Sequence, residues 1–258
     1  MPPKRLLILG GTTEAAALAR AVGDTFPAQT SETETSGGRI DVVTSLAGRI
    51  APRRDIPGRL RIGGFGGIPG LVQYLEAERI DAVVDATHPF AARISANACA
   101  ACTESGTARL ALVRPPWQPA RGDRWREVGS LADAAALLPG SARRAFLTTG
   151  PGGIAAFAPI STVWFLVRVF TPPATPLALP HHDVIVARPP FTLASELALL
   201  RRHRIDTLVT KQSGGPLEAK LAAARQVGAE VVMVRRPPPP PGAVVSSVQQ
   251  ALDWLRQL

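Results

Sequence analysis

Short apolar runs alternate with longer amphipathic segments along the first half of the chain. Runs such as Leu6–Leu9 and Ala82–Asp85 are almost continuously apolar, which is typical of parallel strands covered by helices on both faces. The pattern predicts strands at Leu6–Leu9, Ile40–Thr44, Leu60–Ile62, Ala82–Asp85 and Arg109–Val113, with helices at Thr13–Val22, Leu71–Glu78 and Phe90–Ser105. This alternation indicates a parallel α/β sheet.

A second alternating set follows the proline-containing segment Arg114–Trp117, which is typical of a linker. It predicts strands at Phe146–Thr148, Val163–Val169, Val184–Val186, Thr207–Val209 and Val231–Val234, and helices at Leu193–Arg202, Leu217–Val227 and, after a proline run at Pro237–Pro241, Val244–Leu255. Two similar halves predict an α/β protein of two Rossmann-like parallel-sheet domains with a cleft between them, at residues 1–114 and 115–258.

The composition is that of an ordinary globular protein, with 46% hydrophobic and 19% charged residues in a chain of 258. No apolar run approaches the roughly 18 residues that a membrane helix needs, and the apolar run at Leu6–Leu9 is too short for a signal peptide. We therefore expect a cytoplasmic protein that does not enter the membrane, and no obligate protein partner is evident.

The formal net charge of +9 favours anionic partners. Nucleic acid is one candidate, and a polyphosphate cofactor combined with a polycarboxylate substrate is another. The basic residues are scattered and aromatic residues make up only 5%, which argues against a nucleic-acid surface.

Cys99 and Cys102 form a C-x-x-C within an alanine-rich helical segment, and no second cysteine pair or spaced histidine completes a metal site. We expect two core cysteines and no metal.

The first predicted strand ends in Gly10-Gly11-Thr12-Thr13-Glu14, immediately before a helix. Glycines allow the backbone to turn tightly there, and a helix N-terminus offers free N–H groups and a positive dipole end to phosphate. These five residues are the predicted cofactor loop, although the pattern is not G-x-G-x-x-G. The alternative is a glycine turn with a threonine N-cap that has only a structural role.

The end of the second predicted strand carries Ser45 and Arg49, where an NAD site usually has an acidic residue for the ribose 2′-hydroxyl. A hydroxyl with an arginine suits a 2′-phosphate, which favours NADPH over NADH. A solvated surface arginine is the alternative for Arg49. Two further strand-end loops place Gly64 and Thr87 among the expected cofactor contacts, and His88 among the expected substrate contacts. His88 is alternatively a turn residue that caps the next helix.

The second half carries matching loops after two of its predicted strands. One contains Thr149 and Gly150, and the other contains Lys211, Ser213, Gly214 and Gly215. The latter combines a cation, a hydroxyl and glycine amides before a helix, which together indicate an anion site for the substrate. Lys211 is one of only three lysines in a chain that otherwise uses arginine, although a chance lysine on a loop is the alternative.

Several of these motifs together resemble the precorrin-6A reductase family. They are Gly-Gly-Thr-x-Glu at 10–14, Ser-Leu-Ala-Gly-Arg at 45–49, Gly-Gly-Phe-Gly-Gly at 63–67, Asp-Ala-Thr-His-Pro-Phe-Ala at 85–91, Arg-Pro-Pro-Trp at 114–117 and Thr-Lys-x-Ser-Gly-Gly at 210–215. The resemblance runs in order over nearly the whole chain. It implies an enzyme of cobalamin biosynthesis that reduces one ring double bond of precorrin-6A with NADPH to give precorrin-6B.

The order of the motifs along the chain assigns NADPH to the first half, which already carries a phosphate loop and a 2′-phosphate candidate, and the polycarboxylate tetrapyrrole to the anion site of the second. The proton donor stays open among His88, Glu14, Lys211 and solvent. Another NADPH-dependent oxidoreductase acting on an acidic substrate is the nearest alternative, but not a short-chain dehydrogenase, because Tyr74, the only tyrosine, is followed four residues later by Glu78. A non-enzymatic dinucleotide-binding module and a nucleic-acid-binding protein are the alternatives from other classes.

Overall fold

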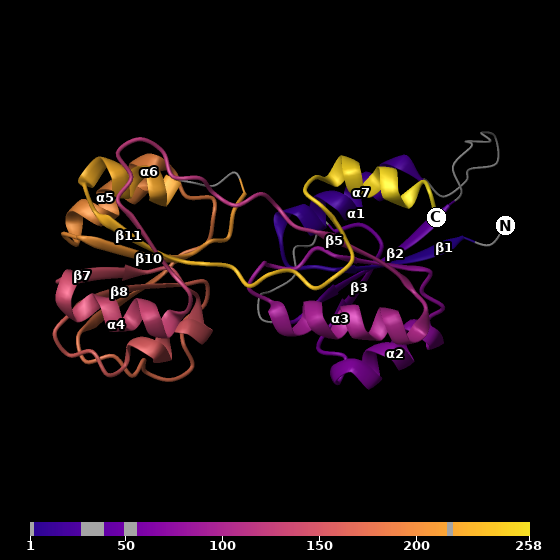
Figure 1. The fold of residues 1–258 in the computed structure, drawn as a ribbon, viewed down its shortest axis with the longest axis horizontal. Coiled ribbons are helices and arrows are strands. Elements are labelled where there is room, and N and C mark those ends of the chain that lie inside the picture. The colour runs from indigo at the N-terminus through magenta and orange to yellow at the C-terminus, as the bar shows by residue number, and fades with distance from the viewer. Residues whose placement is uncertain (1–2, 27–38, 49–55, 216–218) are drawn as a thin grey trace. The chain divides into compact units, whose positions relative to one another are not determined.

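Two six-stranded parallel sheets, each in its own unit, form the framework of the chain (Figure 1). The computed structural model describes residues 3–26, 39–48, 56–215 and 219–258. The first unit consists of residues 1–115 and 237–258, and the second consists of residues 116–236. The predicted class, α/β with two Rossmann-like sheets, is confirmed, while the expected cleft stays a prediction.

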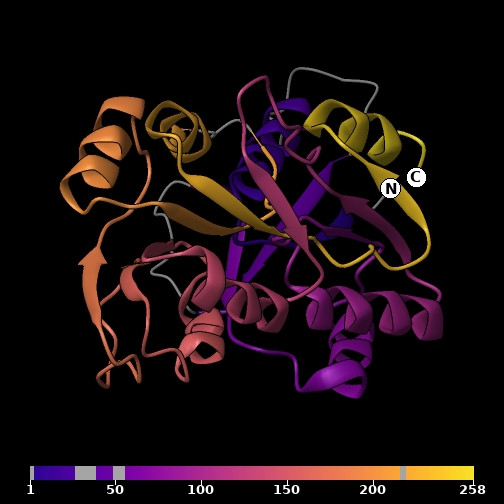
Figure 2. The ribbon, with the colours of Figure 1, turned by 60° about the vertical axis from the view of Figure 1, so that its left-hand side comes forward.

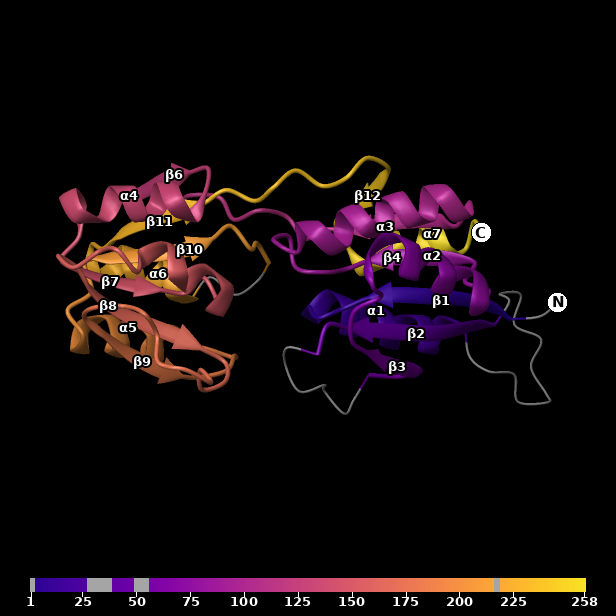
Figure 3. The ribbon, with the colours of Figure 1, turned by 90° about the horizontal axis from the view of Figure 1, so that it is seen from below.

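The sheet of the first unit has the strand order of the Rossmann fold. Its strands are β1 (Lys4–Leu9), β2 (Ile40–Leu46), β3 (Arg59–Ile62), β4 (Ala82–Asp85), β5 (Ala108–Leu112) and β12 (Ala243–Val245). They lie in the order β3-β2-β1-β4-β5-β12, which is the 3-2-1-4-5-6 arrangement if β12 is counted as the sixth strand (Figure 3). In such a sheet the order reverses between β1 and β4, and ligands bind at the carboxyl ends of the strands beside this switch point.

Helices cover both faces of the first sheet. Helices α1 (Thr13–Thr25) and α7 (Val248–Leu255) pack on one face, where Leu18, Ala251 and Leu255 join the apolar core. Helices α2 (Gly67–Ala77) and α3 (Ala92–Ser105) cover the other face, with Leu71 and Leu75 fully or almost fully buried. Burial on both faces explains why the central strands are continuously apolar.

The second unit repeats this strand order. Its strands are β6 (Trp125–Val128), β7 (Arg144–Leu147), β8 (Trp164–Val169), β9 (His182–Val186), β10 (Thr207–Lys211) and β11 (Glu230–Val234), in the order β9-β8-β7-β10-β11-β6. Its switch point therefore lies between β7 and β10. Helices α5 (Leu193–Arg202) and α6 (Ala219–Val227) pack on one face, while Phe157 of the 3-10 helix η1 (Pro151–Phe157) packs on Phe165, beside α4 (Leu131–Ser141).

In each sheet, the strand at the sixth position comes from the beginning or the end of that unit's sequence. In the second unit it is β6, which precedes the other five strands, and in the first it is β12, which follows the whole second unit. Figure 2 shows the yellow C-terminal segment, with strand β12 and helix α7, ending in the first unit. Val245 of β12 pairs with Leu112 of β5, so this strand covers an edge that would otherwise expose unpaired backbone groups.

The C-terminal segment corrects two predictions. Residues 237–258 belong to the first unit, so a second domain running from 115 to 258 is wrong for its last part. The final helix begins at Val248 and not at Val244, because the Ser247 side chain accepts from the Gln250 amide and caps the helix there. The residues before this cap are extended and form β12. The roles assigned to the two domains stay predictions.

Both cysteines lie on α3, as expected for helix residues, and neither forms a disulfide. Cys102 is buried, and burial raises the pKa of its thiol to about 11, whereas Cys99 is half-buried. This pKa leaves Cys102 protonated and unreactive at neutral pH. Within the described part of the chain, no helix combines the length and the apolarity that a membrane crossing requires.

Candidate active site

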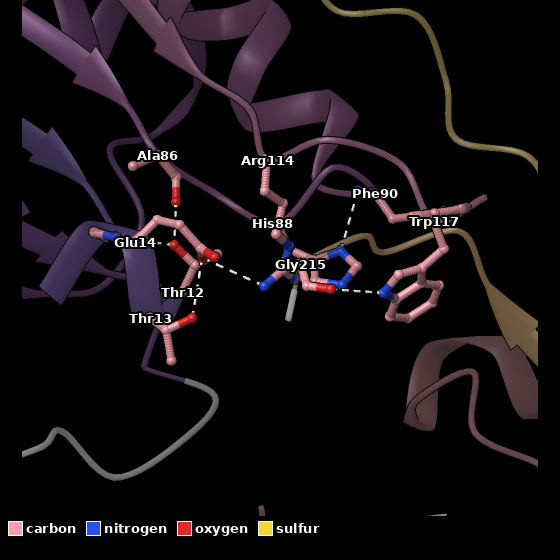
Figure 4. Close-up of polar contacts among 10 residues, drawn as sticks. Thr12, Thr13, Glu14, Ala86, His88, Phe90, Arg114, Trp117 and Gly215 are labelled. Carbon is pink, nitrogen blue, oxygen red and sulfur yellow. Dashed lines mark hydrogen bonds and ion pairs between the residues drawn. The ribbon is translucent and has the colours of Figure 1, made fainter. Parts of the chain in front are cut away.

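The loops after β1 and β4 meet at the switch point of the first sheet. The Thr12 hydroxyl in the loop after β1 donates to the Ala86 carbonyl in the loop after β4, at 2.7 Å (Figure 4). The same hydroxyl accepts from the Ala15 amide at 3.1 Å and so caps α1. The structural role considered for Thr12 is therefore present, and any contact between Thr12 and a cofactor stays a prediction.

The two glycines of the first loop have different local surroundings. A Cβ at Gly10 would lie 3.1 Å from Thr44 Cγ2, so this position must be small for β1 to pack beside β2. Gly11 has a φ of +110°, and a Cβ there would meet nothing within 4 Å. Its backbone therefore faces open space beside the first turn of α1, where helix amides have no intrahelical partner. An open glycine turn at a helix N-terminus fits the phosphates of a dinucleotide.

Glu14 forms an ion pair with the last residue before the linker prolines. Its Oε2 lies 3.3 Å from Arg114 Nη1 and accepts from the Thr13 hydroxyl at 3.1 Å (Figure 4). Both charged side chains are less than a fifth exposed. A carboxylate at a phosphate site would repel the ligand, and the Arg114 guanidinium offsets this charge.

The ends of β2 and β3 bring Ser45 beside Arg61, a residue that the sequence did not single out. The two residues pair in register, and Arg61 Nη1 lies 3.4 Å from Ser45 Oγ. Ser45 is buried, with 6% of its surface exposed, whereas Arg61 is half-buried. Arg49 lies outside the described residues, so its predicted contact with the 2′-phosphate stays a prediction.

The glycine-rich loop after β3 is held by Arg61. The guanidinium donates to the carbonyls of Gly63 and Gly64, at 2.7 and 2.8 Å, and lies 3.8 Å from the centroid of the Phe65 ring. Phe65 also makes an edge contact with Tyr74. Gly64 is exposed and can be reached by a ligand, but its direct contact with the cofactor stays a prediction.

The loop after β4 is fixed by its own polar groups. The Thr87 hydroxyl and amide both contact Oδ1 of buried Asp85, at 2.7 and 3.1 Å. His88 Nδ1 accepts from the Phe90 amide at 3.2 Å (Figure 4). An accepting Nδ1 places the proton of the neutral ring on Nε2. His88 therefore has the turn role that the sequence allowed, but it does not cap α3, whose N-cap is Ala91 without a side-chain cap hydrogen bond.

The switch point of the second sheet carries Lys220, which the sequence analysis did not assign to the site. Its Nζ on α6 donates to Thr210 Oγ1 of β10 at 2.5 Å and to Thr148 Oγ1 after β7 at 3.3 Å. The ammonium also lies 5.1 Å from the centroid of the Trp117 ring. A cation thus joins the two strand ends where the sheet order reverses.

Lys211 ends β10 at the same switch point. It is half-buried, and burial lowers the pKa of its ammonium. The turn after it is tight, since the Ser213 amide donates to the Lys211 carbonyl at 2.7 Å. Gly214 and Gly215 follow with φ of +67° and +91°, and the Gly215 carbonyl accepts from Trp117 Nε1 at 2.8 Å (Figure 4). Residues 216–218 lie outside the described residues, so the expected continuation from this loop into the helix stays a prediction.

Thr149 and Gly150 follow β7 on the other side of this switch point. Thr149 is 4% exposed, and its hydroxyl has no hydrogen-bond partner among the described residues. A Cβ at Gly153 would lie 2.9 Å from this hydroxyl, so Thr149 faces the 3-10 helix. Gly150 turns the chain with a φ of +79°. Contacts between these residues and substrate stay predictions.

Two cavities, one in each unit, share no lining residue with the sites described above. A cavity of about 450 Å³ in the first unit lies at the amino ends of β1, β2 and β3, opposite the switch-point loops. Its charged lining includes the pairs Arg39–Asp41 and Arg59–Glu78, which neutralise each other. A second cavity, of about 440 Å³, is lined mostly by apolar side chains of the second unit. Among the described residues, no group of three or more His, Cys, Asp or Glu side chains is placed to hold a metal.

The fold and these loops define a two-unit Rossmann-like α/β protein with polar groups at both switch points. The family model described as precorrin-6x reductase CbiJ/CobK matches residues 5–256, and the chain belongs to this family of oxidoreductases. It is 47% identical over 256 residues to a precorrin-6A reductase of Rhodococcus erythropolis, covering 98% of each chain. It is 46% identical over 257 residues to one from Mycobacterium tuberculosis, again covering 98% of each. A solved structure of CobK precorrin-6A reductase is 42% identical and matches with a TM-score of 0.88, covering 98% of this chain and 96% of that one.

Proposed function

We propose that this chain reduces one ring double bond of precorrin-6A to give precorrin-6B in cobalamin biosynthesis, with NADPH as the hydride donor. The observation that carries the proposal is the reductase family match from residue 5 to 256, which includes both units. Relatives named precorrin-6A reductase cover the chain almost completely, which supports the reaction as well as the family.

The first unit fits the dinucleotide. Gly11 offers open backbone, and the first amides of α1 face the position where the Rossmann fold holds a pyrophosphate. The Thr12 contact with Ala86 fixes the spacing of the two loops beside that position. Arg61, near the end of β3 and beside Ser45 of β2, suits the extra phosphate that distinguishes NADPH from NADH, and it supports the choice of cofactor.

The second unit supplies cations for the substrate. The precorrin-6A macrocycle carries several carboxylates, and Lys211 and Lys220 both lie at the switch point of this sheet. Lys220 is held by two threonine hydroxyls, which fixes its charge in one place. We assign the substrate carboxylates to these two lysines and to the turn at Ser213, Gly214 and Gly215.

NADPH, when bound, supplies the hydride for the ring carbon. The residues of the chain then bind and orient the two reactants, because a hydride moves only between well-aligned carbons. The neighbouring carbon must also receive a proton, for which His88, Glu14, Lys211 and solvent are the candidates.

The proposal is tested by mixing the protein with NADPH and precorrin-6A without oxygen and following the nicotinamide absorbance. Oxidation of one NADPH for each precorrin-6A is the expected result. A binding module would bind NADPH without oxidising it. Another oxidoreductase would leave precorrin-6A unchanged and oxidise NADPH only with a different acid, and either of these results would overturn the proposal.

A further inference from the structure

Arg61 and Ser45 occupy neighbouring places in one lateral row at the carboxyl end of the first sheet. Ser45 pairs in register with Arg61 on one side and with Leu9 on the other. Neighbours in register point to the same face of a sheet, and Leu9 immediately precedes the glycine turn at Gly10. The Arg61 side chain therefore lies two strands away from the predicted phosphate loop, on the same edge.

The charge of Arg61 is not neutralised by any described residue. Its partners are the Gly63 and Gly64 carbonyls and the Ser45 hydroxyl, with the faces of Phe65 and Tyr74 at 3.8 and 5.1 Å. All of these groups are electrically neutral. Three of the five N–H donors of the guanidinium are used by described residues, which leaves two for a further acceptor.

Arg59, two residues earlier on the same strand, differs from Arg61 in the groups that its guanidinium contacts. Its guanidinium contacts Glu78 Oε2 at 2.6 Å, and this hydrogen bond raises its pKa above the ordinary arginine value. Arg59 is thus paired with an acid at the amino end of β3, while Arg61 has only neutral contacts at the carboxyl end. A half-buried cation held by neutral groups is arranged to receive an anion.

We propose that Arg61 is a residue that selects NADPH, by binding its 2′-phosphate at the ends of β2 and β3. This inference rests on the proposed function, because it assumes that the first unit binds the dinucleotide. The carbonyls of Gly63 and Gly64 and the Phe65 ring hold the guanidinium in place, so little side-chain freedom is lost on binding. Because Ser45 is buried, its hydroxyl positions Arg61. The guanidinium of Arg61 then makes the contact with the phosphate.

The test is a direct binding titration of NADPH, NADH and adenosine 2′,5′-bisphosphate with the wild-type protein and Arg61→Gln. Glutamine can still donate to the loop carbonyls but carries no charge. We expect the Kd of NADPH and of the bisphosphate to rise about tenfold or more, which corresponds to about 1.4 kcal/mol or more, while the Kd of NADH changes less than about twofold. Arg61→Lys, which keeps the charge, should give an intermediate loss.

Arg59→Gln is the matched control. It removes an arginine from the same strand and should leave the ratio of the NADPH and NADH affinities unchanged. Equal loss of both cofactors in Arg61→Gln would show that Arg61 only shapes the loop, and an unchanged ratio would assign the phosphate to another cation; both results overturn the inference. Failure of the wild-type protein to bind NADPH would instead overturn the cofactor part of the proposed function.

Discussion

The Thr12 hydroxyl donates to the Ala86 carbonyl across 2.7 Å, and this bond joins the two loops that flank the switch point of the first sheet. The same oxygen caps α1 by accepting from the Ala15 amide. One side chain therefore sets both the start of the helix and the distance between the loops. These two hydrogen bonds by themselves explain why position 12 is a threonine. A contact between Thr12 and the cofactor therefore needs a separate measurement.

Thr12→Val should lower the free energy of unfolding by about 1–2 kcal/mol, because valine keeps the shape but removes the cap. We also expect weaker NADPH binding, since the loops lose their shared bond. Denaturant unfolding and cofactor titration measure the two effects. Ser130→Ala is the control, because Ser130 caps α4 in the second unit by accepting from the Asp133 amide. It should cost similar stability and leave NADPH binding unchanged.

Gly11→Ala should weaken NADPH binding strongly while the protein stays folded. The added methyl meets no protein atom within 4 Å, so it extends into the space assigned to the phosphates. The φ of +110° makes alanine strained there, at a cost of about 1–3 kcal/mol. Gly106→Ala carries a comparable strain at the end of α3, where a methyl also meets open space. If both variants bind NADPH as the wild type does, the turn at Gly11 is purely structural.

Arg49→Ala should weaken NADPH binding by about 1–3 kcal/mol and barely change NADH binding, on the scale of a lost charge-assisted hydrogen bond. Isothermal titration with each cofactor measures this difference. Equal losses for the two cofactors would place the 2′-phosphate away from Arg49. Comparison with Arg61→Gln then shows whether one arginine or both hold this phosphate.

Lys211→Ala should leave NADPH affinity intact and raise the KM for precorrin-6A, lower kcat, or both. The reason is that Lys211 lies at the switch point of the second unit, to which we assign the substrate carboxylates. Lys4→Ala is the control, because Lys4 is an exposed lysine at the start of β1 in the first unit. Loss of NADPH affinity with intact substrate binding would contradict the division of roles between the units.

Burial of Lys211 makes both the KM for precorrin-6A and the stability of the protein depend on pH. Its pKa in the folded state lies below the ordinary lysine value of 10.5, so the ammonium loses its charge at a lower pH than an exposed lysine does. The KM for precorrin-6A should therefore rise as the pH increases through this lowered pKa. Between the lowered pKa and 10.5 the unfolded chain binds more protons, so this residue makes stability rise with pH. Lys211→Met should remove both trends.

The central strands and the capped helix α5 could be predicted closely from the sequence. Ala82–Asp85 and Leu193–Arg202 were predicted with the bounds that the structure has, because buried strands are continuously apolar and Thr192 gives a clear helix start. Of the four edge strands of the two described sheets, β6 and β12 were missed, whereas β3 and β9 were predicted at least in part. An edge strand has one neighbour and is short and partly polar, so its pattern is weak, and Ala243–Val245 was instead predicted as part of a helix.

The loops of the candidate site were visible in the sequence, but two of its cations were not. Arg61 is one of many arginines, and only its register with Ser45 places it at the site. Lys220 lies on a helix, and its role depends on the neighbouring ends of β7 and β10, which are far apart in the sequence. Sequence patterns describe local structure, whereas these two contacts depend on the order of strands in the sheets.

Direct hydride transfer is the central claim, and transfer of deuterium tests it most directly. The protein is incubated without oxygen with precorrin-6A and NADPH carrying two deuterium atoms at C4 of the nicotinamide, and the product is analysed by mass spectrometry. We predict precorrin-6B that contains one deuterium from the cofactor and one hydrogen from the solvent. A reduced product without cofactor deuterium, or no reduction of precorrin-6A at all, would contradict the account.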